Sequence, residues 1–475
     1  MGATSGIGAR GALGVVGALV VVELASGVLQ GYYVPQLTDI ARALRIPDAD
    51  VNWLEGGQLA LSVVAVPILA KLGDLLGHRR VLLAAIAGTA IASLGLAFAT
   101  SFPVFLALWA VQGLYTAWLP LEIALIAHRA RSRPDPQATT RAGAGVVVAA
   151  LEAGAIAGAL AGGSAQGVLG SLRGALLVPG VLVAVAFLAV LVGVREVPDR
   201  AAGRLDTRGA VLLGVALAVL TGALGLLRLQ PGSALGWLAL LAGLALLAAF
   251  VLVERRTADP LVDMRVLARP AVWPVQLAAL LFGVSVLGAQ GPLSTFVRTD
   301  PARYGYGLGL SSGMLSIVIG VYVLALLVGA LLLGPVSRAV GTRATLIAGS
   351  AVVGAGYLAL IPLHAALGQV IAAMAVAGLG SGALVAALPA AAAAVAPAGR
   401  IAVATGLTNT GKSLGGAFAS CAFAVALAAG APGGTAGSYA GYLTTWAICG
   451  GTALIGAAVL LVVPAAAFPR RAVAA

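Results

Sequence analysis

The chain has 475 residues, of which 61% are apolar and only 9% are Asp, Glu, Lys or Arg. A soluble globular protein carries about 25% charged residues, so this composition excludes an ordinary soluble fold and indicates a surface that lies in lipid. The net charge of +12 comes from short basic clusters between apolar runs, with no basic patch interleaved with aromatic residues, so no nucleic-acid partner is expected.

Fourteen stretches are long and apolar enough to cross a bilayer core about 30 Å thick, which takes roughly 20 helical residues each. Strands of a membrane barrel would be about half as long and would alternate in polarity. The sequence therefore predicts an all-α polytopic membrane protein. The expected spans are residues 13–33, 53–72, 81–99, 104–127, 143–167, 175–194, 209–227, 235–253, 271–293, 310–336, 344–363, 367–391, 401–427 and 442–463.

The basic residues indicate an orientation. Of the 28 Lys and Arg, 21 fall in the tails and one alternate set of connections, and 6 fall in the opposite set. Because Lys and Arg concentrate in cytoplasmic loops, both termini are expected in the cytoplasm, with the protein in the cell membrane. The first apolar run is long and leads directly into the second, so no signal peptide is expected.

Chemistry-bearing motifs are sparse. No phosphate-binding G-x-x-x-x-G-K-[ST] sequence, nucleophile–base set or metal-ligand cluster is present, so we expect no enzyme activity, cofactor or metal. Cys421 and Cys449 fall within apolar runs, which favours packed thiols over a disulfide framework or a zinc site.

The connection after the second span contains a distinctive set of residues: Gly73, Asp74, Gly77, Arg79 and Arg80. Glycines permit a tight turn, and Asp74 can accept hydrogen bonds from helix-end amides or basic partners. This pattern resembles the signature loop between the second and third helices of the major facilitator superfamily, with Ala70 in place of the leading glycine. The resemblance implies a gating loop that locks the two halves of the protein on the cytoplasmic side.

A weaker copy of the loop, residues 334–343, follows the tenth span. It keeps Gly341 and Arg343 but has Arg338 at the position of the aspartate. Residues 204–210 and 250–261 resemble the flanks of the additional helix pair in the fourteen-helix drug:proton antiporter branch, and residues 406–416 resemble its thirteenth helix.

The resemblance implies a major-facilitator fold with two six-helix bundles, residues 1–200 and 266–475, and an inserted pair of helices, residues 201–265, for 14 in total. It implies proton-driven export of drugs or hydrophobic secondary metabolites, hence multidrug efflux and antibiotic resistance. The expected partners of this monomer are membrane lipid, a small-molecule substrate and protons. An importer or facilitator of a small solute, and a non-transporting scaffold or lipid-handling protein, remain alternatives.

The fifth span contains glycines that resemble the antiporter motif of that branch: Gly154, Gly158, Gly162 and Gly163. A spacing of four places the first three on one helical face, where small residues allow close packing. Ala159 stands where the family has proline. Trp109 stands where the family has an arginine in the fourth span, and Ser26 where it has an aspartate in the first.

Carboxylates within apolar spans are costly and usually functional. Glu23 and Glu152 are expected near the membrane midplane, and Glu122 toward the cytoplasmic end of the fourth span. These three are the candidates for proton coupling. A mostly apolar cavity with few polar anchors suits drug-like substrates, and its candidate lining residues are Gln30, Gln58, Trp109, Gln112, Tyr115, Gln290, Asn409 and Lys412.

Overall fold

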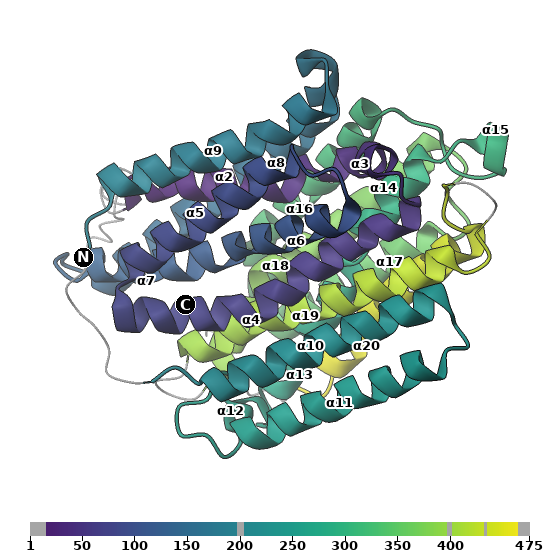
Figure 1. Cartoon of the computed structure of the whole chain (residues 1–475). Helices are drawn as coiled ribbons and strands as arrows, with labels where there is room; N and C mark the ends of the chain where they lie inside the picture. The colour runs from purple at the N-terminus through teal and green to yellow at the C-terminus, as the bar shows by residue number, and fades with distance from the viewer. Residues whose placement is uncertain (1–15, 197–203, 397–400, 432–434, 464–475) are drawn as a thin grey trace. The chain divides into compact units, whose positions relative to one another are not determined.

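The computed structural model describes residues 16–196, 204–396, 401–431 and 435–463, and every regular element in these ranges is helical (Figure 1). The predicted all-α polytopic fold is confirmed in outline. The start of the first predicted span and both chain termini lie outside the described residues. The longer helices are α2 (Leu19–Tyr32), α4 (Asn52–Leu76), α5 (His78–Leu96), α6 (Phe102–Gln112), α7 (Trp118–Ala130), α8 (Pro136–Leu169), α9 (Leu172–Gly193), α10 (Thr207–Leu229), α11 (Ala234–Glu254), α13 (Trp273–Phe282), α14 (Gln290–Arg298), α16 (Ser312–Val340), α17 (Thr342–Ala359), α18 (Leu367–Val395), α19 (Ile401–Ala428) and α20 (Tyr439–Leu460).

The number of spans differs from the expectation. In the part of the chain that the structure describes, 12 helices are long and apolar enough to cross a membrane, so the predicted count of fourteen is not supported. The two predicted spans that fall short are the first and the eleventh. Among the described residues of the first, 14 form α2, and α17 has 18 residues, with the polar side chains of Thr342, Arg343 and Thr345 in its first turn.

Side chains at the helix starts explain several boundaries. An Asp or Ser that precedes a helix accepts a hydrogen bond from the first turn and satisfies an otherwise unpaired N–H group. Asp135 caps α8 and Asp206 caps α10 in this way. Ser171, Ser233 and Ser438 do the same for α9, α11 and α20.

The described chain divides into two compact units. Unit 1 comprises α2, the second half of α4 from Val64, and α5 to α9. Within it, α2 packs along α8, and α5 packs along α9. The fourth span is interrupted between α6 and α7 by a 3-10 turn, η3 (Gly113–Ala117).

Unit 2 comprises residues 35–63 and the chain from Asp206 onward. Residues 35–63 contain α3 (Leu37–Leu44), the 3-10 turn η2 (Asp48–Val51) and the first half of α4. In this unit α18 packs on α16 and α17, and α10 packs on both α11 and α19. A π-helical turn, η4 (Gly283–Leu287), separates α13 from α14. The division into residues 1–200, 201–265 and 266–475 stays a prediction.

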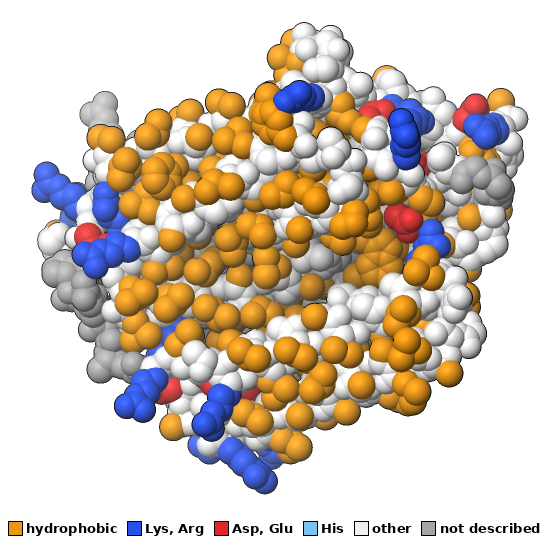
Figure 2. All heavy atoms as spheres, viewed as in Figure 1, with side chains coloured by type: hydrophobic (Ala, Val, Ile, Leu, Met, Phe, Trp, Pro, Cys, Tyr) orange, Lys and Arg blue, Asp and Glu red, His pale blue; other side chains and the backbone are white. Residues whose placement is uncertain are grey.

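Apolar side chains also cover outward-facing surfaces within each unit. Val192 on α9 is 86% exposed and Leu241 on α11 is 62% exposed. Hydrophobic side chains cover both helices in the space-filling view, and Lys and Arg gather near helix ends (Figure 2). Helices with this distribution are stable only where lipid covers the apolar faces, so the chain is a multi-pass membrane protein.

Candidate functional site

Two buried carboxyl groups meet inside unit 1. Glu23 projects from α2 and Glu122 from α7, and both residues are 0% exposed. Their carboxyl groups lie close enough to interact directly. None of their four oxygens accepts a hydrogen bond of normal geometry from a described residue, although the Ser26 side chain also lies close enough to interact with Glu23. Two bare negative charges in contact within an apolar interior repel strongly, so this geometry suits a shared proton or a bound cation.

The third candidate for proton coupling is placed differently. Glu152 lies on α8 and is half-buried. The sequence named all three glutamates, and the structure pairs Glu23 with Glu122. The role of each in coupling stays a prediction.

A second polar cluster in unit 1 joins two of the predicted cavity residues. The Gln112 side-chain amide donates hydrogen bonds to the Tyr33 hydroxyl at 3.0 Å and to Ser93 Oγ at 2.9 Å. The Tyr33 ring packs on Trp109, with centroids 4.9 Å apart. The buried amide of Gln112 is therefore held by its neighbours, and the Tyr33 ring to which it donates packs on Trp109.

The remaining predicted cavity residues divide between the units. In unit 1, the rings of Tyr115 and Trp118 pack together with their centroids 6.4 Å apart, and Gln30 is exposed on α2. In unit 2, Gln58 is buried, Gln290 and Lys412 are half-buried, and Asn409 is exposed. Whether the eight residues line one cavity stays a prediction.

The glycines of the fifth span form a close helix contact. A Cβ atom added at Gly154 would lie 2.2 Å from the Leu24 carbonyl oxygen, and one at Gly162 would lie 2.0 Å from that of Tyr32. A Cβ atom added at Gly158 would lie 2.8 Å from the Val28 carbonyl oxygen. The adjacent Gly163 is buried. The spacing of four thus places the glycines against the backbone of α2, the helix that carries Glu23.

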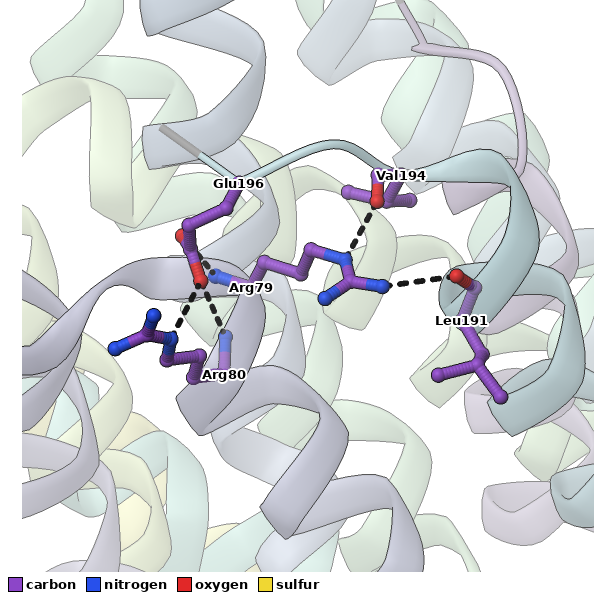
Figure 3. A network of polar contacts seen from close by, with 5 residues as sticks. All are labelled: Arg79, Arg80, Leu191, Val194 and Glu196. Carbon is purple, nitrogen blue, oxygen red and sulfur yellow. Dashed lines mark hydrogen bonds and ion pairs between the residues drawn. The ribbon is translucent and has the colours of Figure 1, made fainter. Parts of the chain in front are cut away.

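The loop after α4 forms a network within unit 1 (Figure 3). Arg79 donates hydrogen bonds to two carbonyl oxygens at the end of α9, that of Val194 at 2.6 Å and that of Leu191 at 2.8 Å. The Glu196 carboxylate accepts hydrogen bonds from the backbone N–H groups of Arg79 and Arg80, at 3.3 and 3.2 Å. A carboxylate at the start of α5 is favourable because the first N–H groups of a helix are unpaired.

The glycines and the aspartate of this loop have separate roles. Gly77 adopts φ +110°, a conformation that other residues rarely adopt, and forms the sharp turn between α4 and α5. A Cβ atom at Gly73 would lie 2.6 Å from a methyl group of Leu121. Oδ1 of Asp74 lies 3.2 Å from Nε2 of His78, and the Asp74 side chain is half exposed. The helix-end amides that we expected Asp74 to accept from are instead bound by Glu196, which the sequence analysis did not single out.

The weaker copy of the loop repeats the arginine contact in unit 2. Gly341 has φ +89°. Arg343 donates hydrogen bonds to the Leu460 carbonyl oxygen at 3.4 Å and to that of Leu461, both at the end of α20. Each unit therefore has a loop arginine that binds the carbonyl oxygens at the end of a later helix.

Two ion pairs hold residues 35–63 within unit 2. Arg298 on α14 binds Asp39 on α3 at 2.6 Å, and both side chains are mostly buried. Arg228 at the end of α10 binds both carboxylate oxygens of Asp50, at 3.1 and 3.3 Å. The sequence offered no signal for these pairs, because their members lie 259 and 178 residues apart.

The fold and the repeated loop are those of a multi-pass helical transporter with two related halves. The family model described as Major Facilitator Superfamily matches residues 19–420. The chain belongs to this superfamily, and its members are transporters.

Curated relatives have several substrates. The cephamycin export protein CmcT of Amycolatopsis lactamdurans is 31% identical over 396 residues, which cover 80% of this chain and 78% of that protein. The uridine/deoxyuridine transporter of Lactococcus lactis subsp. cremoris is 26% identical over 282 residues, 58% of this chain and 56% of its own length. Among solved structures, the nucleoside transporter NupG has a TM-score of 0.63 at 13% identity, covering 94% of this chain and 97% of that one. This likeness shows the fold alone.

Proposed function

We propose that the chain is a proton-coupled exporter of drugs or hydrophobic secondary metabolites. The observation that carries the proposal is the Glu23–Glu122 pair, which is fully buried and accepts no hydrogen bond of normal geometry from the described residues. A relative that is 31% identical is an export protein, which supports the direction of transport. Efflux of this kind would contribute to antibiotic resistance.

The pair suits proton coupling for an electrostatic reason. One proton shared between two carboxyl groups removes half of the buried charge, and the two protons of such a coupled pair are lost in two separate steps. When the cavity opens to water, solvation favours loss of the proton. A cationic substrate can then bind to the negatively charged pair in place of the proton. Because the substrate and the proton compete for the same pair, alternating access exchanges one for the other across the membrane.

The proposal includes the finer points of architecture. Helices α2 and α17 are the two further spans, which gives fourteen, with α10 and α11 as the inserted pair between two six-helix bundles. Both termini lie in the cytoplasm, since the basic connections concentrate on one side. Within unit 1, Trp109 and Gln112 contribute to substrate binding.

Transport by purified protein in liposomes with an imposed pH gradient tests coupling. The probes are ethidium as a lipophilic cation, a cephamycin and uridine. Glu23→Gln and Glu122→Gln keep the side-chain size and remove the titrating group, so each should abolish gradient-driven accumulation while exchange of substrate across the membrane persists. Asp259→Asn is the matched control, because Asp259 is exposed in a loop between helices.

Three outcomes oppose the proposal. If the double mutant still concentrates a substrate with normal pH dependence, the pair does not carry the proton. Loss of accumulation only in Glu152→Gln would transfer the role to Glu152. Uridine exchange that ignores the pH gradient, with no flux of the other probes, would establish a facilitator of a small solute.

A further inference from the structure

Two carboxyl groups meet at one end of the helix pair α10 and α11, within unit 2. Asp206 directly precedes α10, and Glu254 is the last residue of α11, so the pair lies where the start of one helix meets the end of the other. Glu254 is 2% exposed, and Asp206 is half-buried. This pair is separate from Glu23 and Glu122, which belong to unit 1.

Each of the two carboxyl groups binds the backbone with one of its oxygens. Asp206 Oδ1 accepts a hydrogen bond from the Gly209 N–H at 2.8 Å and so caps α10. Glu254 Oε2 accepts a hydrogen bond from the Val262 N–H at 2.8 Å, which holds the turn after α11 against the helix end. The backbone therefore fixes the position of both side chains.

The other oxygens of the two groups face each other. A Cβ atom added at Gly209 would lie 2.1 Å from Glu254 Oε1 and 2.7 Å from Asp206 Oδ2, so these two oxygens converge on one point beside the glycine. Both oxygens are buried, and neither has a hydrogen-bond partner of normal geometry among the described residues. The two carboxyl groups are close enough to interact directly. Two bare carboxylates in this arrangement would repel each other without a donor between them.

The charged groups of the adjacent segments do not neutralise the pair. Neither carboxylate forms an ion pair with a Lys or Arg that the structure describes. The charged side chains that point to solvent here are Arg208 of α10, Arg255 and Arg256 after α11, Asp259 in the turn, Arg265 of α12 (Met264–Leu267), and Arg269.

The remaining ionisable groups around the pair have contacts of their own. Asp263 accepts a hydrogen bond from the backbone N–H of Arg265, and the Arg265 guanidinium donates to the Arg255 carbonyl oxygen at 3.4 Å. Helix α19 also packs on α10, and its ionisable residues, Lys412 and Cys421, lie beside Gly283 and Gly56. A proton is therefore the positive charge that the two facing oxygens can share.

We propose that Asp206 and Glu254 bind one proton between Oδ2 and Oε1, and that this proton holds the end of the α10–α11 pair closed. A hydrogen bond between a carboxyl group and a carboxylate is short and strong. Helix dipoles place the proton on Glu254, because a negative charge is favourable at the start of α10 and unfavourable at the end of α11. A metal ion is a poorer occupant, because it requires more ligands and no group of three or more His, Cys, Asp or Glu side chains among the described residues could hold one.

The shared proton makes this end of the helix pair sensitive to pH. The closed pair binds a proton that two separated carboxylates would release at neutral pH, so the closed arrangement is favoured at low pH and weakens as the pH rises. When the proton is lost, the two negative charges repel. The turn that Glu254 holds through Val262 then separates from α10 more readily.

Hydrogen–deuterium exchange of the full-length protein in detergent, measured by mass spectrometry on residues 255–264, tests the proposal. After correction for the intrinsic effect of pH on exchange, protection of this segment in the wild type should fall between about pH 6 and about pH 9, by up to about tenfold per pH unit for one proton. Glu254→Gln gives Asp206 a permanent N–H donor, so its protection should not depend on pH. Asp206→Asn gives Glu254 such a donor and should show the same flat profile.

The matched control is Asp259→Asn, which removes an exposed carboxylate from the same turn and should keep the wild-type profile. A flat profile in the wild type, or a wild-type profile in both test variants, would overturn the shared proton. Equal flattening by Asp259→Asn would assign the pH dependence to the general charge of the turn and would also overturn it. Recovery of protection at about pH 9 on addition of millimolar Ca²⁺ would assign the pair to a metal ion. Because the two test variants change opposite sides of the hydrogen bond, either one tests the proposal if the other fails to fold.

Discussion

The contact between α2 and α8 gives the sharpest test of the structure, through the change Gly162→Ala. The added Cβ atom would lie 2.0 Å from the Tyr32 carbonyl oxygen and 2.9 Å from its carbonyl carbon. A carbon and a carbonyl oxygen normally stay about 3.3 Å apart, so the helices must separate by about 1.3 Å at this point. The Tyr32 carbonyl oxygen and carbon belong to the backbone of α2, which cannot rotate out of the way as a side chain can.

The cost follows from two opposing effects. Overpacking a close interface costs about 1–3 kcal/mol, whereas replacing glycine with alanine in a helix favours the folded state by up to about 1 kcal/mol. A net loss of roughly 1–2 kcal/mol is expected. The matched control is Gly145→Ala on the same helix, where no atom lies within 4 Å of the added Cβ. The control should be as stable as the wild type or slightly more stable.

The assay is the fraction of detergent-solubilised protein that stays monodisperse after heating, compared across temperatures. Gly162→Ala should lose this fraction at a lower temperature than Gly145→Ala. Transport should fall as well, because α2 carries Glu23 and α8 fixes the position of α2. A Gly162→Ala protein as heat-resistant as the control would refute the close contact.

Three further predictions concern the ion pairs and the loop. Glu196→Gln weakens the hydrogen bonds to the N–H groups of Arg79 and Arg80, and should lower stability by about 1 kcal/mol in the same heating assay; no change would show that the carboxylate is dispensable. A double-mutant cycle of Asp39→Asn and Arg298→Met should give a coupling of roughly 1–2 kcal/mol, because the pair is mostly buried and bonded at 2.6 Å; additive effects would contradict the pairing. Asp74→Asn should slow turnover with substrate affinity unchanged, since Asp74 in the last turn of α4 contacts His78, the first residue of α5; unchanged turnover would count against a gating role.

The sequence predicted the positions of the helices well because a membrane span is a continuous run of apolar residues, which can be recognised without knowledge of the rest of the fold. The glycine stripe of α8 was predicted for the same reason, since a spacing of four fixes one helical face without knowledge of the partner. The partner itself, α2, was not predictable. Nothing in the sequence at Gly154 specifies that the facing backbone is that of Leu24.

Long-range pairs were the main omission. Glu23 and Glu122 were each named as unusual charges, yet their contact depends on how α2 and α7 pack, which local patterns do not encode. Glu196 was missed because a single acid beside Arg195, just after a span, looks like an ordinary solvated residue. The structure gives it a specific role, since the turn at Gly77 brings the first N–H groups of α5 to its carboxylate.

The two loop arginines show which contact of the signature loop occurs in both units. Arg79 and Arg343 each follow a glycine with positive φ and bind carbonyl oxygens at the end of a later helix, in separate units. The aspartate position is not repeated, because Arg338 occupies it in unit 2. A helix leaves its last four carbonyl groups unpaired, and an arginine that satisfies them fixes one helix end against the next. The arginine contact therefore suits assembly of each unit, and the aspartate is free to serve a function that only unit 1 requires.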